Sequence, residues 1–283
     1  MSQVSNLKHD PAGWRKFPSK VQPLDKEKVR ALLKAEWDKF EKQTKASGLE
    51  NARSSKTLPL GVTSSFQHWD PYPISIVSGK GAYVTDVDGR KLLDLSMGFG
   101  AMMVGHLNPK VVKAVKKALR STGTLFVTPS PTATVAAEAF CKRFGLDMIR
   151  FTNSGTESLM YAIRTARAVT GKRAIIKLEG GYHGGYDPLQ VSVKPSLANI
   201  GDPNAPIPEV PFEVEAGEVF VVPYNNLDYL EKIMSDHAHK VAAFVLEPVM
   251  ENISIVLPDE GYLQGVRELC DRFEIALIFD EVK

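Results

Sequence analysis

Apolar runs of strand length recur in the second half of this 283-residue chain, and polar or aromatic residues follow each run at once. The runs at 174–178, 241–246 and 275–279 have the length and composition of buried strands. Helix-like segments lie between most of them, and this alternation predicts a mostly parallel sheet with crossover helices. Ligands of such α/β folds bind where the strands end, so the residues after each run form the candidate site.

The segment at 151–158 constrains the chemistry most, because a short strand-like run at 148–152 breaks there into a polar turn and enters a strongly helical segment. Ser154, Gly155 and Thr156 would present hydroxyls and backbone N–H groups at a helix N-terminus, which favours an anion such as phosphate. An ordinary helix cap explains the same residues, since Ser and Thr are preferred N-caps. The turn alone leaves both interpretations open.

Candidate residues also follow the other three strands. Each candidate also has a purely structural explanation. Asp and Glu are common in the turns that follow strands, and aromatic or histidine side chains in loops can face solvent. The residues at these strand ends are Tyr182, His183, Glu247, Asp280 and Val282.

Taken in order, these segments resemble the class III aminotransferases, a family of the fold-type-I enzymes that use pyridoxal 5'-phosphate (PLP). Within that family they are most similar to the branch that includes glutamate-1-semialdehyde aminomutase. The similarity runs from about residue 58 to residue 283 and includes further motifs at 81–89, 104–109 and 223–227. It implies an α/β fold with the mostly parallel sheet and crossover helices of the large domain, and without the C-terminal small domain.

The resemblance implies a contact with PLP for each candidate residue. Asp280 would partner the pyridine nitrogen and so be the catalytic residue, Val282 and Tyr182 would cover opposite ring faces, and Glu247 would be a hydrogen-bond partner beneath the cofactor. Glu251 stands where the family usually has glycine. The complete set of expected cofactor-binding residues is Ser154, Gly155, Thr156, Tyr182, His183, Glu247, Asn252, Asp280 and Val282.

The family's Schiff-base lysine has no counterpart in this chain, because the family carries it a few tens of residues beyond the motif at 280–282. Lys283 is a poor substitute, since side chains alternate along a strand and it would point away from the face shared by Asp280 and Val282. We therefore expect the 283-residue chain alone to be inactive and to be part of a longer enzyme.

The implied function is that of a PLP-dependent aminotransferase, which moves an amino group between an amine or amino acid and a carbonyl compound. An aminomutase of the glutamate-1-semialdehyde type or an amino-acid epimerase would use the same cofactor contacts. An alternative of another class is an inactive fragment that serves as a binding or oligomerisation module. The family also implies a homodimer. The sequence does not indicate the substrate or the arginine that would bind its carboxylate.

Composition narrows the remaining classes of function. A net charge of +2 argues against a nucleic-acid or membrane partner, and the absence of a signal-peptide pattern or a long apolar run predicts a cytoplasmic protein. The histidines and cysteines lack structural-zinc spacing, so no metal is expected. Cys141 and Cys270 lie among apolar neighbours and are expected to be reduced thiols.

The chain is expected to divide into three parts. Residues 1–57 would form an irregular arm, at 1–23, and a helix; residues 58–108 would hold a β-hairpin around Asp88 and Gly89; residues 109–283 would form an incomplete PLP-binding large domain. The helix carries an apolar stripe that would pack on the protein's own body or on a symmetry mate. The stripe consists of Val29, Leu32, Leu33, Trp37 and Phe40.

Overall fold

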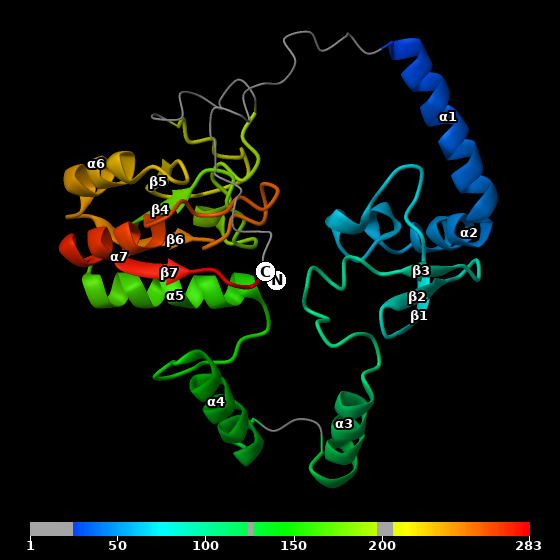
Figure 1. Ribbon diagram of the computed structural model, residues 1–283, viewed down its shortest axis with the longest axis horizontal. Coiled ribbons are helices and arrows are strands. Elements are labelled where there is room, and N and C mark those ends of the chain that lie inside the picture. The colour runs from blue at the N-terminus through cyan, green and yellow to red at the C-terminus, as the bar shows by residue number, and fades with distance from the viewer. Residues whose placement is uncertain (1–24, 124–126, 197–205) are drawn as a thin grey trace, which may run out of the picture. The chain divides into compact units, whose positions relative to one another are not determined.

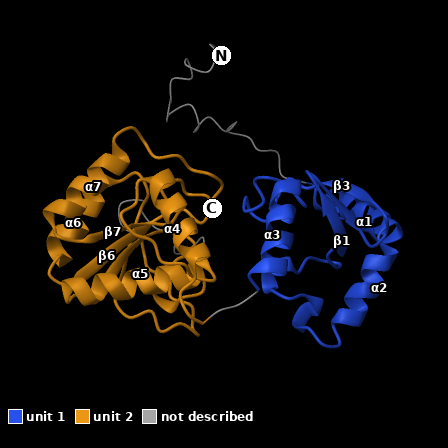
Figure 2. Cartoon of the chain, turned by 90° about the horizontal axis from the view of Figure 1, so that it is seen from below, with its two compact units in different colours: residues 1–123 blue, residues 124–283 orange. Residues whose placement is uncertain are grey.

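The computed structural model describes residues 25–123, 127–196 and 206–283. The chain divides into two compact units, residues 1–123 and residues 124–283 (Figure 2). The irregular arm predicted at 1–23 lies outside the described residues, and the predicted domain boundaries after residues 57 and 108 stay predictions. Within the described residues, no helix combines the length and the apolarity needed to cross a bilayer.

The first unit combines helices with a small antiparallel sheet. The predicted hairpin is confirmed, because β2 and β3 pair antiparallel on either side of Asp88 and Gly89, and Gly89 adopts a φ of +82° that suits the tight turn. Its elements are α1 (Lys26–Gln43), α2 (Lys45–Ser54), short 3-10 turns at Pro59–Gly61 and Ser65–Gln67, β1 (Ile76–Lys80), β2 (Tyr83–Asp86), β3 (Lys91–Leu93) and α3 (Pro109–Ser121).

The helix predicted near the N-terminus is confirmed as α1. It begins after Asp25, whose carboxylate accepts the N–H groups of Glu27 and Lys28 as an N-cap. No residue of α1 is buried, and most of its apolar stripe, named the α1 stripe from here on, is exposed: Leu32 is 59% exposed and Trp37 is 43% exposed. Phe40, its last member, is partly buried, and its ring centroid lies 5.4 Å from that of Tyr72. Phe40 thus gains part of the cover predicted from the protein's own body, and cover of the other members by a symmetry mate stays a prediction.

Buried residues of the first unit are polar. Asp88 accepts the Ser47 hydroxyl at 2.6 Å, together with the backbone N–H groups of Ala46 and Ser47, which ties α2 to the hairpin turn. Asp86 accepts the Arg90 Nε at 2.7 Å across the same turn. Desolvation alone would raise the pKa of Asp88, but the hydrogen bonds from Ser47 and Ala46 together with the nearby charge of Arg90 lower it. The unit is therefore held by charge-assisted hydrogen bonds around its hairpin.

The second unit is a four-stranded sheet in the order β5-β4-β6-β7, with every neighbouring pair parallel. Helices lie on both of its faces, which confirms the predicted α/β fold (Figure 1). Its elements are α4 (Pro131–Phe144), α5 (Gly155–Thr170), β4 (Ala174–Leu178), a 3-10 turn at Asp187–Leu189, β5 (Val219–Val222), α6 (Leu227–His237), β6 (Val241–Leu246), α7 (Tyr262–Arg272) and β7 (Ala276–Phe279).

The core of the second unit forms on both faces of this sheet. On one face Ile176 and Phe244 pack against α6 and α7, and on the other Ile175 and Val245 pack against Ile163 of α5. All residues of β4 and β6 are buried, as expected for central strands of a parallel sheet. Burial on both faces explains why the sequence shows these strands as continuous apolar runs.

Two strand predictions need correction. The run at 148–152 precedes α5 as predicted, yet it is no strand, because a strand requires a hydrogen-bonded neighbour and none pairs with it among the described residues. Met148 is accordingly 89% exposed and Phe151 is 52% exposed. Conversely, the four-residue strand β5 was not anticipated from the sequence, since its run is short and lies beside a loop rich in proline and glycine.

Candidate active site

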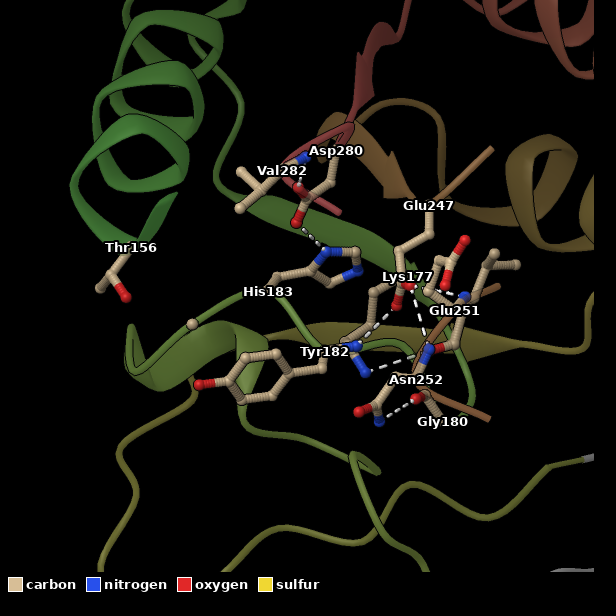
Figure 3. A network of polar contacts seen from close by, with 12 residues as sticks. Thr156, Lys177, Gly180, Tyr182, His183, Glu247, Glu251, Asn252, Asp280 and Val282 are labelled. Atoms are coloured by element: carbon tan, nitrogen blue, oxygen red, sulfur yellow. Dashed lines mark hydrogen bonds and ion pairs between the residues drawn. The ribbon is translucent and has the colours of Figure 1, made fainter. Parts of the chain in front are cut away.

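The candidate residues gather at one edge of the second unit's sheet. Because β4, β6 and β7 are parallel, their carboxyl ends meet there, and the segments that follow carry the side chains predicted from the sequence. The N-terminus of α5 reaches the same edge, where Thr156 Oγ1 accepts the backbone N–H of Gly185 at 3.0 Å. Figure 3 shows the residues that the fold brings together: Thr156, Tyr182, His183, Glu247, Asn252, Asp280 and Val282.

Ser154 is the N-cap of α5. Its Oγ accepts the N–H of Glu157 at 3.2 Å, and the Glu157 carboxylate accepts the N–H of Asn153 at 2.8 Å in return. The helix-cap interpretation of this turn is therefore realised. The cap still leaves donors for an anion, because the N–H groups of Gly155 and Thr156 belong to the first turn and have no partner within the helix.

Gly184 lets α5 approach the turn that follows β4. A Cβ built on Gly184 would lie 2.1 Å from Thr156 Oγ1, and the residue has a φ of +82°, so both space and backbone conformation require glycine. A Cβ on Gly155 would similarly lie 3.0 Å from a methyl group of Val282. These close approaches place the start of α5 against the segments that follow β4 and β7.

His183 and Asp280 form a buried pair. The Nδ1 of His183 lies 2.8 Å from Oδ2 of Asp280, and the two residues are 2% and 8% exposed. An ionised carboxylate only accepts, which assigns the proton to Nδ1 as its donor. Asp280 Oδ1 accepts the N–H of Val282 at 3.1 Å, so the turn role considered for this residue is present as well. The buried Nε2 of His183 has no partner within the described part of the chain.

Glu247 joins the turn after β4 to the loop after β6. Its carboxylate accepts the N–H groups of Tyr182 at 3.0 Å, Glu251 at 2.9 Å and Asn252 at 3.3 Å. The side chain of Asn252 adds a second link by donating to the carbonyl of Gly180 at 2.9 Å. Glu251, where the resembled family usually has glycine, contributes a backbone N–H to this network, and that contact does not depend on its side chain.

Tyr182 and Val282 are the exposed members of the site. Their exposed fractions are 52% and 70%, and in Figure 3 they lie on either side of His183. Exposed apolar surface beside a buried His–Asp pair offers contact area to a planar ligand. The predicted roles of the two side chains on opposite faces of such a ring stay predictions.

Lys177 was not singled out from the sequence, although a charged residue inside an apolar run was the available signal. It is fully buried in β4, and its Nζ donates to the carbonyls of Leu178 at 3.0 Å and Val191 at 2.6 Å. Burial lowers the pKa of Lys177 to about 7, against the attraction of Glu247 and Glu179. Burial also raises the pKa of Glu179, whose Oε1 has no partner among the described residues.

Comparison with known proteins identifies the family of this chain. The family model for the class-III aminotransferases matches residues 65–283. The chain belongs to the class-III aminotransferase family. Among its curated relatives, the glutamate-1-semialdehyde 2,1-aminomutase of Thermoplasma volcanium is 38% identical over 230 residues, which cover 81% of this chain and 54% of the relative. The chain therefore spans about half the length of the curated relatives it matches.

Solved structures agree with the assignment and with the expected fold. An omega-transaminase from Sphaerobacter thermophilus is 34% identical with a TM-score of 0.79, and the match covers 84% of this chain and 55% of the transaminase. A transaminase described with PLP bound is 32% identical with a TM-score of 0.76, over the same shares of the two chains. The predicted fold of the PLP-dependent transferases is thereby confirmed for the part of the fold that this chain represents.

Proposed function

We propose that the protein is a PLP-dependent aminotransferase that moves an amino group between an amine or amino acid and a carbonyl compound. The buried His183–Asp280 pair beside the N-terminus of α5 carries this proposal, because it sets a fixed carboxylate near an anion-favouring helix end. Membership of the family and similarity to a transaminase described with PLP bound support it.

The residues at the sheet edge fit PLP. The N–H groups of Gly155 and Thr156 would bind the phosphate, since the start of α5 is the positive end of a helix dipole. Asp280 would accept the N–H of the pyridine nitrogen, because its oxygens retain lone pairs beside those used by His183 and Val282. Tyr182 and Val282 have the exposed surface needed to cover the ring.

Each of these residues has a definable task in the reaction. When bound, PLP supplies an electron sink for negative charge at the substrate Cα. Asp280 would keep a proton on the pyridine nitrogen through a charge-assisted hydrogen bond, and His183 would hold that carboxylate in place. Glu247 would orient the segment that carries Tyr182 by accepting its N–H. Asn252 would support the same segment through the carbonyl of Gly180.

The test is a PLP titration of the purified protein, followed by incubation with an amine donor and a carbonyl acceptor and detection of both exchanged products by mass spectrometry. Saturable binding with product formation is the expected result for the protein that includes a Schiff-base lysine, which we propose lies outside this chain. Borohydride reduction and peptide mapping locate that lysine. No saturable PLP binding would refute the proposed function, and stoichiometric labelling of a lysine within residues 1–283 would refute its proposed location.

An aminomutase is the second candidate, because the curated relatives at 38% identity carry the name glutamate-1-semialdehyde 2,1-aminomutase. The two activities differ in mass balance. An aminomutase converts glutamate-1-semialdehyde into an isomer of equal mass without an added acceptor, whereas an aminotransferase needs a separate acceptor and changes the mass of both substrates. Incubation with glutamate-1-semialdehyde alone therefore decides between them.

We further propose a cytoplasmic homodimer that has neither a nucleic-acid nor a membrane partner. The exposed α1 stripe supports a second copy as its cover, since apolar side chains at helical spacing usually face a partner surface. Light scattering during size-exclusion chromatography measures the mass. A dimer that Leu32→Asp dissociates is the expected result, with the exposed polar position Lys28→Asp as the matched control; a monomeric wild type contradicts the proposal.

A further inference from the structure

Lys177 stands inside a strand whose five residues are all buried. β4 lies between β5 and β6, and the register sets Lys177 beside Val221 on one neighbour and Val245 on the other. Burying an ammonium group costs free energy, which is the reason for its lowered pKa. An apolar side chain would occupy this position without that cost, so its presence points to a task other than packing.

The ammonium group of Lys177 links two backbone segments, one before and one after the site turn at 179–185. Its acceptors are the carbonyl of Leu178, at the end of β4, and the carbonyl of Val191, thirteen positions later in the chain. The backbone continues both ties: the N–H of Gly181 donates to the Leu178 carbonyl at 3.2 Å, and the N–H of Gly180 donates to the Ser192 carbonyl at 2.8 Å. Lys177 therefore lies at the base of the turn that presents Tyr182 and His183.

Glu247 holds the same turn from the adjacent strand. It lies two positions beyond Val245, the register neighbour of Lys177, so both side chains belong to the same face of the sheet. Figure 3 shows Lys177 close to Glu247 and to the turn. The carboxylate attracts the ammonium group and accepts the N–H of Tyr182 at 3.0 Å. The turn is thus fixed at its base by Lys177 and at its middle by Glu247.

We propose that Lys177 is a positioning residue, which fixes the turn carrying Tyr182 and His183 by holding the carbonyls of Leu178 and Val191 together. The inference rests on the proposed function, because that turn would contact PLP. Lys177 acts through the turn and not by contact, since its side chain is fully buried. Such a role predicts that removing the amine weakens cofactor binding without lowering the stability of the fold.

The test compares Lys177→Met with wild type and with the matched control Ile176→Met, which alters packing in the same strand on the opposite sheet face. Measurements at pH 6 keep Lys177 charged in the wild type, given its pKa of about 7. For Lys177→Met we expect an apparent Kd for PLP raised by about tenfold or more, from the loss of two hydrogen bonds made by a charged group. We expect an unchanged or higher unfolding temperature, because the desolvation cost is removed.

A third measurement is independent of the cofactor. Hydrogen exchange of the peptide spanning 179–185 is expected to accelerate in Lys177→Met and to stay at the wild-type rate in Ile176→Met. A lower unfolding temperature, failure of Lys177→Met to fold, unchanged exchange in the turn, or unchanged PLP affinity would each overturn the inference. A wild-type protein that binds no PLP would refute the proposed function alone, since the exchange rates and unfolding temperatures still decide the role of Lys177.

Discussion

The two units of the chain are stabilised in different ways. Among the described residues every buried apolar side chain belongs to the second unit. There Phe244 of β6 and Ile163 of α5 belong to the clusters on opposite faces of the sheet. The first unit buries Thr44, Ser47 and Asp86 and leaves most of its α1 stripe exposed. The second unit thus has its own apolar core, which can keep the site residues at the sheet edge in fixed positions. The first unit has polar ties and uncovered apolar surface, which is typical of a segment that needs a partner surface.

Truncating one aromatic side chain in each unit tests this contrast most strongly. Phe244→Ala in β6 should lower the free energy of unfolding by about 3–5 kcal/mol, since it leaves a cavity between the sheet and its helices. In the dissociated monomer, Trp37→Ala in α1 should change it by less than about 1 kcal/mol, because that side chain is 43% exposed in a single chain. Denaturant unfolding at low protein concentration measures both. Equal losses at a concentration that dissociates the proposed dimer would show that the same chain covers the stripe.

Asp280→Asn tests the function of the site without disturbing the core that supports it. In the PLP-loaded protein with its Schiff-base lysine, the variant should retain PLP and lower the rate of amino transfer by roughly 10²–10³-fold, because the pyridine proton loses its charged partner. The fold should remain, since asparagine has nearly the same size, its Oδ1 can still accept the N–H of Val282, and its amide NH2 can donate to Nδ1 of the other neutral His183 tautomer. Single-turnover kinetics with near-normal rates would count against the assignment of Asp280.

The buried lysine makes the stability of the second unit depend on pH. The unfolded chain keeps the Lys177 proton up to its ordinary pKa of 10.5, whereas the folded chain releases it at about 7. Between these values the unfolded state binds more protons, so wild-type stability should rise with pH relative to Lys177→Met, by up to about 1.4 kcal/mol per pH unit. Denaturant unfolding at pH 6, 8 and 9.5 measures this difference, and parallel curves for the two proteins would contradict the assignment.

The N-cap of α5 provides the smallest expected effect. Ser154→Ala removes the hydrogen bond to the N–H of Glu157 and should destabilise the protein by about 1 kcal/mol. Ser130, the N-cap of α4, makes no side-chain capping bond, so Ser130→Ala is the matched control with almost no effect. A PLP titration of the same variants distinguishes the two interpretations of this turn. Loss of PLP affinity beyond the control indicates that Ser154 also serves the phosphate.

Local patterns in the sequence predicted the elements that depend on local physics. The runs of β4 and β6 are apolar because these strands are buried within the sheet, whereas the run of β7 lies at the edge of the described sheet and is only partly buried. Asp88 with Gly89 specifies a hairpin through its turn geometry. The strand predicted at 148–152 is absent because strand formation is not decided by the local sequence alone. A strand depends on a partner, and the apolar run contains no information about whether one lies beside it.

The sequence identified which residues collect at the sheet edge, but not how they bind one another. His183 and Asp280 are 97 positions apart, and their contact depends on the strand order β4-β6-β7, which periodicity does not specify. Lys177 shows the same limit. Its charge was visible within an apolar run, while its acceptor on Val191 depends on the path of an irregular segment. Pairings that cross the sheet follow from topology, and topology is a property of the assembled fold.

The position of β7 at the edge of the sheet determines when the site can exist. Asp280 reaches its place only when the segment after β7 docks on β6, where its N–H donates to the carbonyl of Leu246 at 2.9 Å. The turn it joins lies 97 residues earlier, so the site includes one of the slow, long-range closures of folding. During synthesis Asp280 and Val282 emerge after the other candidate residues of this chain. A cofactor that needs them would bind only after β7 has joined the sheet of the second unit, and its occupancy would then report that this step is complete.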